Sequence, residues 1–133
     1  MAVMLLVGCA SRPPGPGEAF GDFIKAFNER DLPRFIGAFE PDATIFFDLS
    51  EPPGRVSGRE KIREVFAPFF ASARGFQLAP VEVVVQRSDD IAVISFHLVS
   101  PDGLARRSLV WRFSGGAWRI WHLHASSVET EAQ

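Results

Sequence analysis

The spacing of apolar residues changes near Gly75, from the repeat of a helix to the repeat of a strand. Before this point, one predicted helical face carries Phe20, Phe23, Ile24 and Phe27. After it, strand-like segments cover 76–87, 91–99, 104–113 and 118–128. The sequence therefore predicts an α+β fold, in which helices cover one face of a curved antiparallel sheet.

Three helices and a further strand are expected before the four-stranded meander. Asp31 is placed to cap a second helix, which stops before Pro41 and points four apolar side chains inward: Leu32, Phe35, Ile36 and Phe39. The Thr- and Phe-rich segment 43–48 reads as a strand. Residues 57–60 match a capping box that opens a third helix, and Pro68 is expected to kink or end that helix near Ala67. The expected inward residues of this helix are Ile62, Val65, Phe66, Phe69 and Phe70.

The last two strands are apolar on both faces. If Gly115-Gly116 forms a two-residue turn, one face carries Arg107, Leu109, Trp111, Phe113, Trp118, Ile120, His122 and His124. The other face still carries Val110, Trp121 and Leu123. Only one face can meet the helices, so we expect a homodimer through the outer face of the sheet.

The N-terminal residues suggest a targeting signal and a tether rather than part of the fold. Residues 6–9, Leu-Val-Gly-Cys, resemble the lipobox of bacterial lipoproteins, and Cys9 is the single cysteine of the chain. A Pro- and Gly-rich stretch follows and would act as a tether. We therefore divide the chain into a lipoprotein-like signal and tether, 1–17, and one domain, 18–133. An acylated Cys9 would hold the protein in the bacterial cell envelope, facing the periplasm or the exterior; an unprocessed Cys9 would leave it in the cytoplasm.

Four motifs in this order resemble the SnoaL-like branch of the nuclear transport factor 2-like superfamily. They are A-F-N-E-R-D-L-P-R-F at 26–35, D-A-T-I-F-F-D at 42–48, S-G-R-E-K-I-R-E at 57–64 and W-R-I-W-H-L-H-A-S at 118–126. The resemblance implies a cone-shaped fold: a bent sheet wraps three helices and leaves a pocket at its wide end. It also implies dimers that form through the sheet.

The resemblance does not settle the activity, because the superfamily contains isomerases, cyclases, dehydratases and binding modules. The ketosteroid isomerase branch pairs a base aspartate with a hydrogen-bonding Tyr. Here Asp48 falls one residue later than that pattern, and the chain has no Tyr. The hub domain of calcium/calmodulin-dependent protein kinase has a similar ending and lines its pocket with arginines. Those positions are Leu98, Leu109 and Ala125 here.

Asp48 and His122 are the candidate catalytic residues, because either could move a proton beside a substrate carbonyl. The alternatives are a strand-end aspartate that starts a loop and a histidine that is satisfied within the core. Arg107 could meet a ligand carboxylate or stand on the surface. The candidate ligand-binding residues are Phe47, Phe66, Phe70, Phe96, Arg107, Trp111, Trp118, His122 and His124.

Composition and motifs exclude several partners. The net charge of −2 argues against nucleic acid, which needs a concentrated basic face. The sequence contains no P-loop, Rossmann glycines or EF-hand loop, so we expect no cofactor, and we find no carboxylate or cysteine spaced to complete a metal site with the histidines. Membrane contact is expected only through a lipid on Cys9.

The sequence thus favours a domain that binds a small apolar molecule, with an isomerase, cyclase or dehydratase as the first alternative. A dimeric assembly module with a vestigial pocket is the second alternative.

Overall fold

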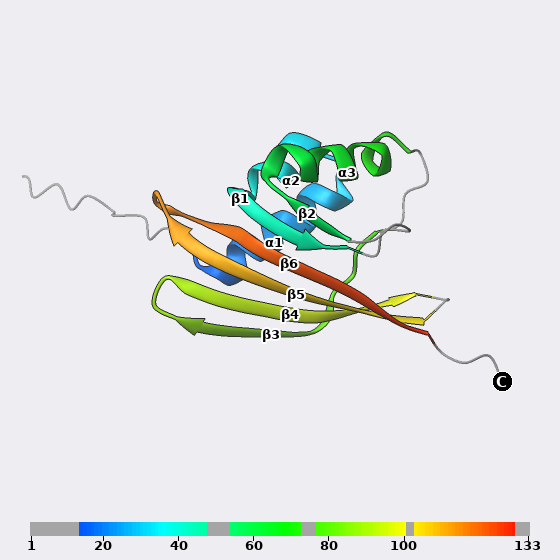
Figure 1. The fold of residues 1–133 in the computed structure, drawn as a ribbon. Coiled ribbons are helices and arrows are strands. Elements are labelled where there is room, and N and C mark those ends of the chain that lie inside the picture. Colours follow the sequence, from blue (N-terminus) through cyan, green and yellow to red (C-terminus); the bar gives the residue numbers. More distant parts are fainter. Residues whose placement is uncertain (1–13, 48–53, 73–76, 101–102, 130–133) are drawn as a thin grey trace, which may run out of the picture.

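A computed structural model describes residues 14–47, 54–72, 77–100 and 103–129. In this part of the chain, the elements are α1 (Pro16–Asn28), α2 (Leu32–Gly37), β1 (Phe39–Phe46), β2 (Arg55–Ser57), α3 (Arg59–Ala71), β3 (Val81–Ser88), β4 (Ile91–Ser100), β5 (Gly103–Ser114) and β6 (Ala117–Glu129). The helices lie together on one side of the sheet (Figure 1). No helix among these residues is both long enough and apolar enough to span a bilayer.

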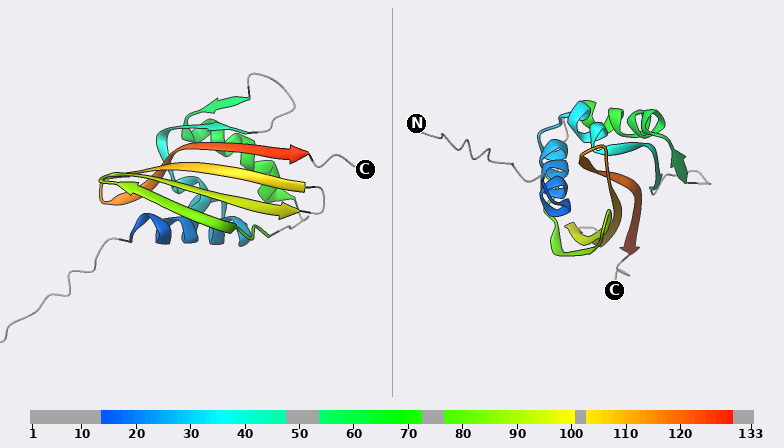
Figure 2. Two further views of the ribbon diagram at one scale, coloured as in Figure 1. Left: turned by 90° about the horizontal axis from the view of Figure 1, so that it is seen from below. Right: turned by 90° about the vertical axis from the view of Figure 1, so that its left-hand side faces the viewer.

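The strands form one sheet in the order β2-β1-β6-β5-β4-β3. Strands β3 to β6 are the predicted antiparallel meander, while β1 runs parallel to β6 and joins the sheet through it. Viewed from its end, the sheet bends around the helices without closing (Figure 2). The predicted α+β cone is therefore confirmed. We call the side that faces the helices the concave face and the opposite side the convex face.

Phenylalanine rings form the centre of the core. Phe35 on α2 is 2% exposed, and its ring stacks on Phe23 of α1 with 4.7 Å between centroids. It also meets Phe66 of α3 at 4.8 Å and Phe39 of β1 at 5.6 Å. Offset-stacked and edge-to-face ring pairs are the favoured aromatic geometries. These contacts join the three helices to one another and to the sheet.

The second helix ends earlier than the sequence predicts. It stops at Gly37, and Phe39 is the first residue of β1 rather than the last inward residue of the helix. Asp31 caps the helix as expected, because its carboxylate accepts a hydrogen bond from the backbone of Arg34. Pro41 lies inside the strand, where the register with β6 shifts, and an irregularity of this kind is where a strand tolerates proline.

The predicted capping box is wrong. Gly58 is the N-cap of α3 with φ +96°, no side chain caps the helix, and Ser57 instead pairs with Thr44 in the short strand β2. The backbone N–H of Gly58 donates to the carbonyl of Ala43, which ties the start of the helix to β1. Only glycine takes this backbone conformation without strain.

Of the two outcomes predicted for Pro68, a kink or an end of α3 near Ala67, the end is wrong. The helix continues through Pro68 to Ala71. Pro68 is exposed and close to the end of the helix, so the carbonyl that loses its hydrogen bond lies near solvent.

One extra residue in β6 reverses the predicted faces of this strand. The turn at Gly115-Gly116 is the predicted two-residue turn, since Ser114 pairs with Ala117. However, Ile120 pairs with Trp111 and His122 with Val110, so Trp121 is a bulge. A one-residue insertion moves every later side chain to the opposite face. Leu123 is therefore buried on the concave side, and the prediction that the two histidines share the face of Arg107 is wrong.

Candidate functional site

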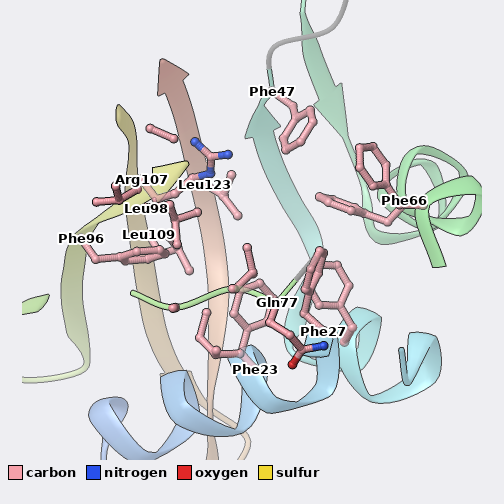
Figure 3. A pocket seen from close by; sticks show the side chains of 17 residues that line it. Phe23, Phe27, Phe47, Phe66, Gln77, Phe96, Leu98, Arg107, Leu109 and Leu123 are labelled. Atoms are coloured by element: carbon pink, nitrogen blue, oxygen red, sulfur yellow. The ribbon is translucent and has the colours of Figure 1, made fainter. Parts of the chain in front are cut away.

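A cavity of about 380 Å³ lies between the helices and the concave face of the sheet. This volume falls within the range of small-molecule pockets. In Figure 3, Phe47 and Phe66 stand on one side of the cavity, and Phe96, Leu98 and Arg107 stand on the other. The lining residues are Phe23, Ile24, Phe27, Phe35, Phe47, Phe66, Phe69, Gln77, Leu78, Ala79, Phe96, Leu98, Val99, Ala105, Arg107, Leu109 and Leu123.

The segment 77–79, between α3 and β3, forms one wall of this cavity and is held by Asn28 at the end of α1. The side-chain amide of Asn28 donates to the carbonyl of Leu78 over 3.0 Å and accepts from its backbone N–H over 2.7 Å. Gln77 donates from its side chain to the carbonyl of Asn28 over 3.1 Å. The Asn28 side chain therefore pairs with the wall much as a neighbouring strand would.

Arg107 is the only charged residue among the described residues that line the cavity. It lies on the concave side of β5, opposite Ala125, and its Nη1 donates to the carbonyls of Arg106 (3.0 Å) and Ser126 (3.4 Å). Its guanidinium carbon lies 5.9 Å from the centroid of the Phe47 ring. A guanidinium carries five N–H donors in a planar fork, so a group fixed in this way suits the polar end of an otherwise apolar ligand.

Four of the predicted ligand-binding residues lie in the cavity wall: Phe47, Phe66, Phe96 and Arg107. Three others belong to the core instead. Trp111 and Trp118 are buried, and Phe70 packs its ring against Phe27 and Phe35. The spacing in the sequence correctly predicted that these side chains point inward. It does not show whether an inward side chain lines the cavity or packs against other core residues.

His122 and His124 lie on the convex face, away from the cavity. The Nδ1 atom of His122 is 2.8 Å from the Thr44 hydroxyl oxygen. The Phe46 ring contacts both imidazoles, with centroid distances of 5.5 and 5.6 Å, and the Arg55 guanidinium lies over that ring at 4.7 Å. Burial lowers the pKa of His122 below 6.5; the charges of His124 and Arg55 lower it further, and a hydrogen bond with Thr44 opposes them.

The remaining predicted residues are outside the described part of the chain. Asp48 and Cys9 fall in 48–53 and 1–13, so their positions stay predictions. Within the described residues, no three His, Cys, Asp or Glu side chains gather as metal ligands would.

Sequence reasoning missed Asn28 and the wall that it holds. The two polar groups of the Asn28 side chain are the signal that could have indicated a backbone contact. The wall residues Gln77 to Ala79 fall inside the predicted strand 76–87, but β3 begins only at Val81, so this part of the prediction is wrong. Leu98 and Ala105 carried the period of their strands, but nothing in that period separates a cavity wall from a packed core.

Comparison of the sequence with known protein families shows which family this chain belongs to. The sequence pattern of a family described as SnoaL-like domain matches residues 17–130. The chain belongs to this SnoaL-like family. No match was found among the curated proteins.

Solved structures show the same fold for the SnoaL-like domain at low sequence identity. A nuclear transport factor 2-like protein of unknown function from Pseudomonas putida is 18% identical, with a TM-score of 0.74 over 86% of this chain and 85% of that one. A suggested dehydratase of the same family from Streptomyces avermitilis is 21% identical, with a TM-score of 0.73 over 86% and 94%. A suggested calcium/calmodulin-dependent protein kinase type II association domain from Thiobacillus denitrificans is 20% identical, with a TM-score of 0.73 over 87% and 97%. The same fold therefore occurs in proteins for which different functions have been suggested.

Proposed function

We propose that the SnoaL-like domain binds a small apolar molecule with one end that accepts hydrogen bonds, such as a carboxylate or carbonyl. The observation that carries this proposal is the cavity of about 380 Å³, whose described lining is apolar except for Arg107 and Gln77. Apolar walls supply most of the affinity of such a pocket, and a few polar groups orient the ligand. Arg107 would hold the polar end.

An isomerase, cyclase or dehydratase receives less support from the geometry. That function needs a group that moves a proton within hydrogen-bond reach of the substrate. His122 and His124 lie on the other face of the sheet, and Arg107 stays protonated under ordinary conditions. Asp48 is the predicted base that is left, and it is outside the described residues.

A matched pair of variants tests the binding proposal. Ala105→Trp would fill the cavity from β5, whereas Arg106→Trp places the same ring on the opposite, exposed side of the same strand. Native mass spectrometry of protein purified from its own host should show a bound small molecule on the wild type and on the Arg106 variant, and none on the Ala105 variant. A wild-type protein that carries no ligand, or equal retention by both variants, would count against the proposal.

We further propose that two copies pack through the convex face. Trp121 is 39% exposed there, beneath the Arg112 guanidinium at 4.4 Å. Trp121→Glu should convert this dimer to monomer in sedimentation velocity. Gly17→Glu adds the same charge at an open position on α1 and should leave the dimer intact.

For the localisation of the protein, we propose that acylated Cys9 anchors the domain in the bacterial cell envelope. Incorporation of a radioactive fatty acid by the wild type and not by Cys9→Ala is the expected result. Equal labelling of both proteins would rule the anchor out.

A further inference from the structure

Strand β3 ends the sheet and is exposed along its whole length. It pairs with β4 on one side only, because it stands last in the strand order. All eight of its residues are exposed, including four valines at 42–51%: Val81, Val83, Val84 and Val85. An edge strand also presents unpaired backbone N–H and C=O groups, which can form hydrogen bonds with another strand.

The valines at the centre of β3 point to both sides of the sheet. Val84 is opposite Ser95 on the convex side, and Val85 is opposite the buried Ile94 on the concave side. Strand alternation places Val83 on the same side as Val85. The run Val83-Val84-Val85 is therefore symmetric about Val84, with one valine on the convex side and two on the concave side.

The usual protection of an edge strand is confined to the ends of β3. A bulge disturbs its beginning, where Glu82 has φ +53° and its carboxylate lies 2.7 Å from His97 Nδ1. Near the other end, the Arg87 guanidinium lies 4.9 Å from the Trp118 ring centroid. Natural edges are protected by charges, prolines or bulges. The bulge lies between Val81 and Val84, and the segment from Val84 to Gln86 carries none of these features.

We infer that β3 pairs edge to edge with β3 of a second copy, antiparallel and about a two-fold axis at Val84, so that the two sheets become continuous. In this register, Val84 lies opposite the partner's Val84, and Val83 lies opposite the partner's Val85. A two-fold interface must be complementary to itself, and the symmetric valine run meets that requirement. Cross-strand pairs of branched apolar residues are favourable in antiparallel ladders.

The charges of β3 select this arrangement over its alternatives. Parallel pairing would put Glu82 beside the partner's Glu82 and Arg87 beside the partner's Arg87, and like charges directly opposite are unfavourable. An antiparallel pair centred on Val85 would place Val83, in the middle of the valine run, against the partner's Arg87, whereas the pair centred on Val84 places only Val81, at the end of the strand, against it. The register centred on Val84 instead brings the acidic end of each strand toward the basic end of the other.

The expected association is reversible. One pair of edge strands buries less than the roughly 1,200 Å² at which standard stable interfaces begin. We therefore expect the paired fraction to depend on protein concentration. The edge pairing uses residues other than those of the convex-face dimer, so the two contacts would together build assemblies larger than two copies.

Two double variants with the same residues changed test the register. Val83→Lys with Val85→Lys places lysine opposite lysine at both cross-strand positions, and we expect association to weaken at least about tenfold. Val83→Lys with Val85→Glu places lysine opposite glutamate and should keep association close to the wild-type strength. Both variants alter exposed concave positions outside the cavity wall. Sedimentation velocity over a concentration series measures the association, and circular dichroism checks the fold.

The result expected is that the wild type and the Lys/Glu variant increase in mass with concentration and the Lys/Lys variant does not. The same series in a Trp121→Glu background removes the convex-face contact, so failure of one interface is distinguishable from failure of the other. Equal association by the two double variants would overturn the inferred register. A wild type in that background that stays monomeric at every concentration would overturn the edge pairing.

Discussion

Strands β3 and β4 are neighbours in one sheet and are both rich in branched apolar residues, yet their surroundings are opposite. On β4, Ala92, Ile94 and Phe96 are buried under the helices. On β3, Val84 is 51% exposed, and its neighbour Val85 is 46% exposed although it lies on the same side as Ile94. Residue type therefore does not decide burial at this edge. Val84 lies on the convex side, away from the helices, and Val85 lies on the concave side but beyond the helices that cover Ile94 of β4.

The largest expected effect is the difference in unfolding free energy between a core substitution and a substitution on the edge strand β3. Phe35→Ala should lower the free energy of unfolding by about 3–5 kcal/mol, because it removes the ring that joins the helices to the sheet. Val84→Ala, at the centre of β3, should change it by less than about 0.5 kcal/mol. Urea unfolding followed by circular dichroism measures both. The measurement is made at low protein concentration, where the edge contact is dissociated, and similar losses for the two variants there would contradict the exposure of β3 in the single chain.

The next effect concerns the polar group inside the cavity. Arg107→Leu should weaken ligand binding by about 1.5–3 kcal/mol, the contribution of a hydrogen bond to a charged group, with the free energy of unfolding changed much less. The ligand retained by the wild type, titrated by calorimetry, provides the measurement. The exposed neighbour on the other face supplies the control variant, Arg106→Leu. An unchanged affinity in Arg107→Leu would show that the ligand does not use this residue.

A smaller effect is expected at the wall of the cavity. Asn28→Ala removes both hydrogen bonds to Leu78 and should cost about 1–2 kcal/mol of stability, since the Leu78 backbone groups are left partly buried without their present partner. Hydrogen exchange at Leu78 should accelerate, while exchange in β5 stays slow. Glu29→Ala removes only exposed ion pairs with Lys25 and Arg34, so it should cost less than about 1 kcal/mol and leave exchange at Leu78 unchanged. Slow exchange at Leu78 in the Asn28 variant would show that the wall is held in another way.

The smallest effect is a dependence of stability on pH from the convex face. The pKa of His122 is lower in the folded chain than the unfolded value of 6.5, so the unfolded chain binds more protons as the pH falls. Relative to acidic solution, the stabilisation is present above the unfolded pKa and is lost as the pH falls from that value through the lower folded pKa. His122→Gln should therefore flatten the decline in unfolding free energy between about pH 7.5 and 5.5. An equally steep decline in the variant would assign it to other groups.

The predicted parts of this molecule are those that follow from local periodicity. The helical face of α1, the four strands of the meander and the turn at Gly115-Gly116 are all visible as short-range patterns. The bulge at Trp121 is not, because it depends on how β6 fits between β5 and β1, where His122 pairs with Val110 on one side and Thr44 on the other. That single residue moved both candidate histidines out of the predicted site. Arg107 lies on β5, whereas the extra residue is in β6, so Arg107 kept its predicted face.

The contact made by Asn28 has a consequence for how this domain can diversify. Its amide contacts only main-chain atoms of Leu78, so the side chains of Leu78 and Ala79 are not needed for attachment, whereas the Gln77 side chain adds one hydrogen bond to the Asn28 carbonyl. Substitutions there can reshape one side of the cavity while its anchorage persists. A descendant of this protein could thus acquire a different ligand through substitutions in the wall segment 77–79, while the packed phenylalanines of the core stay unchanged.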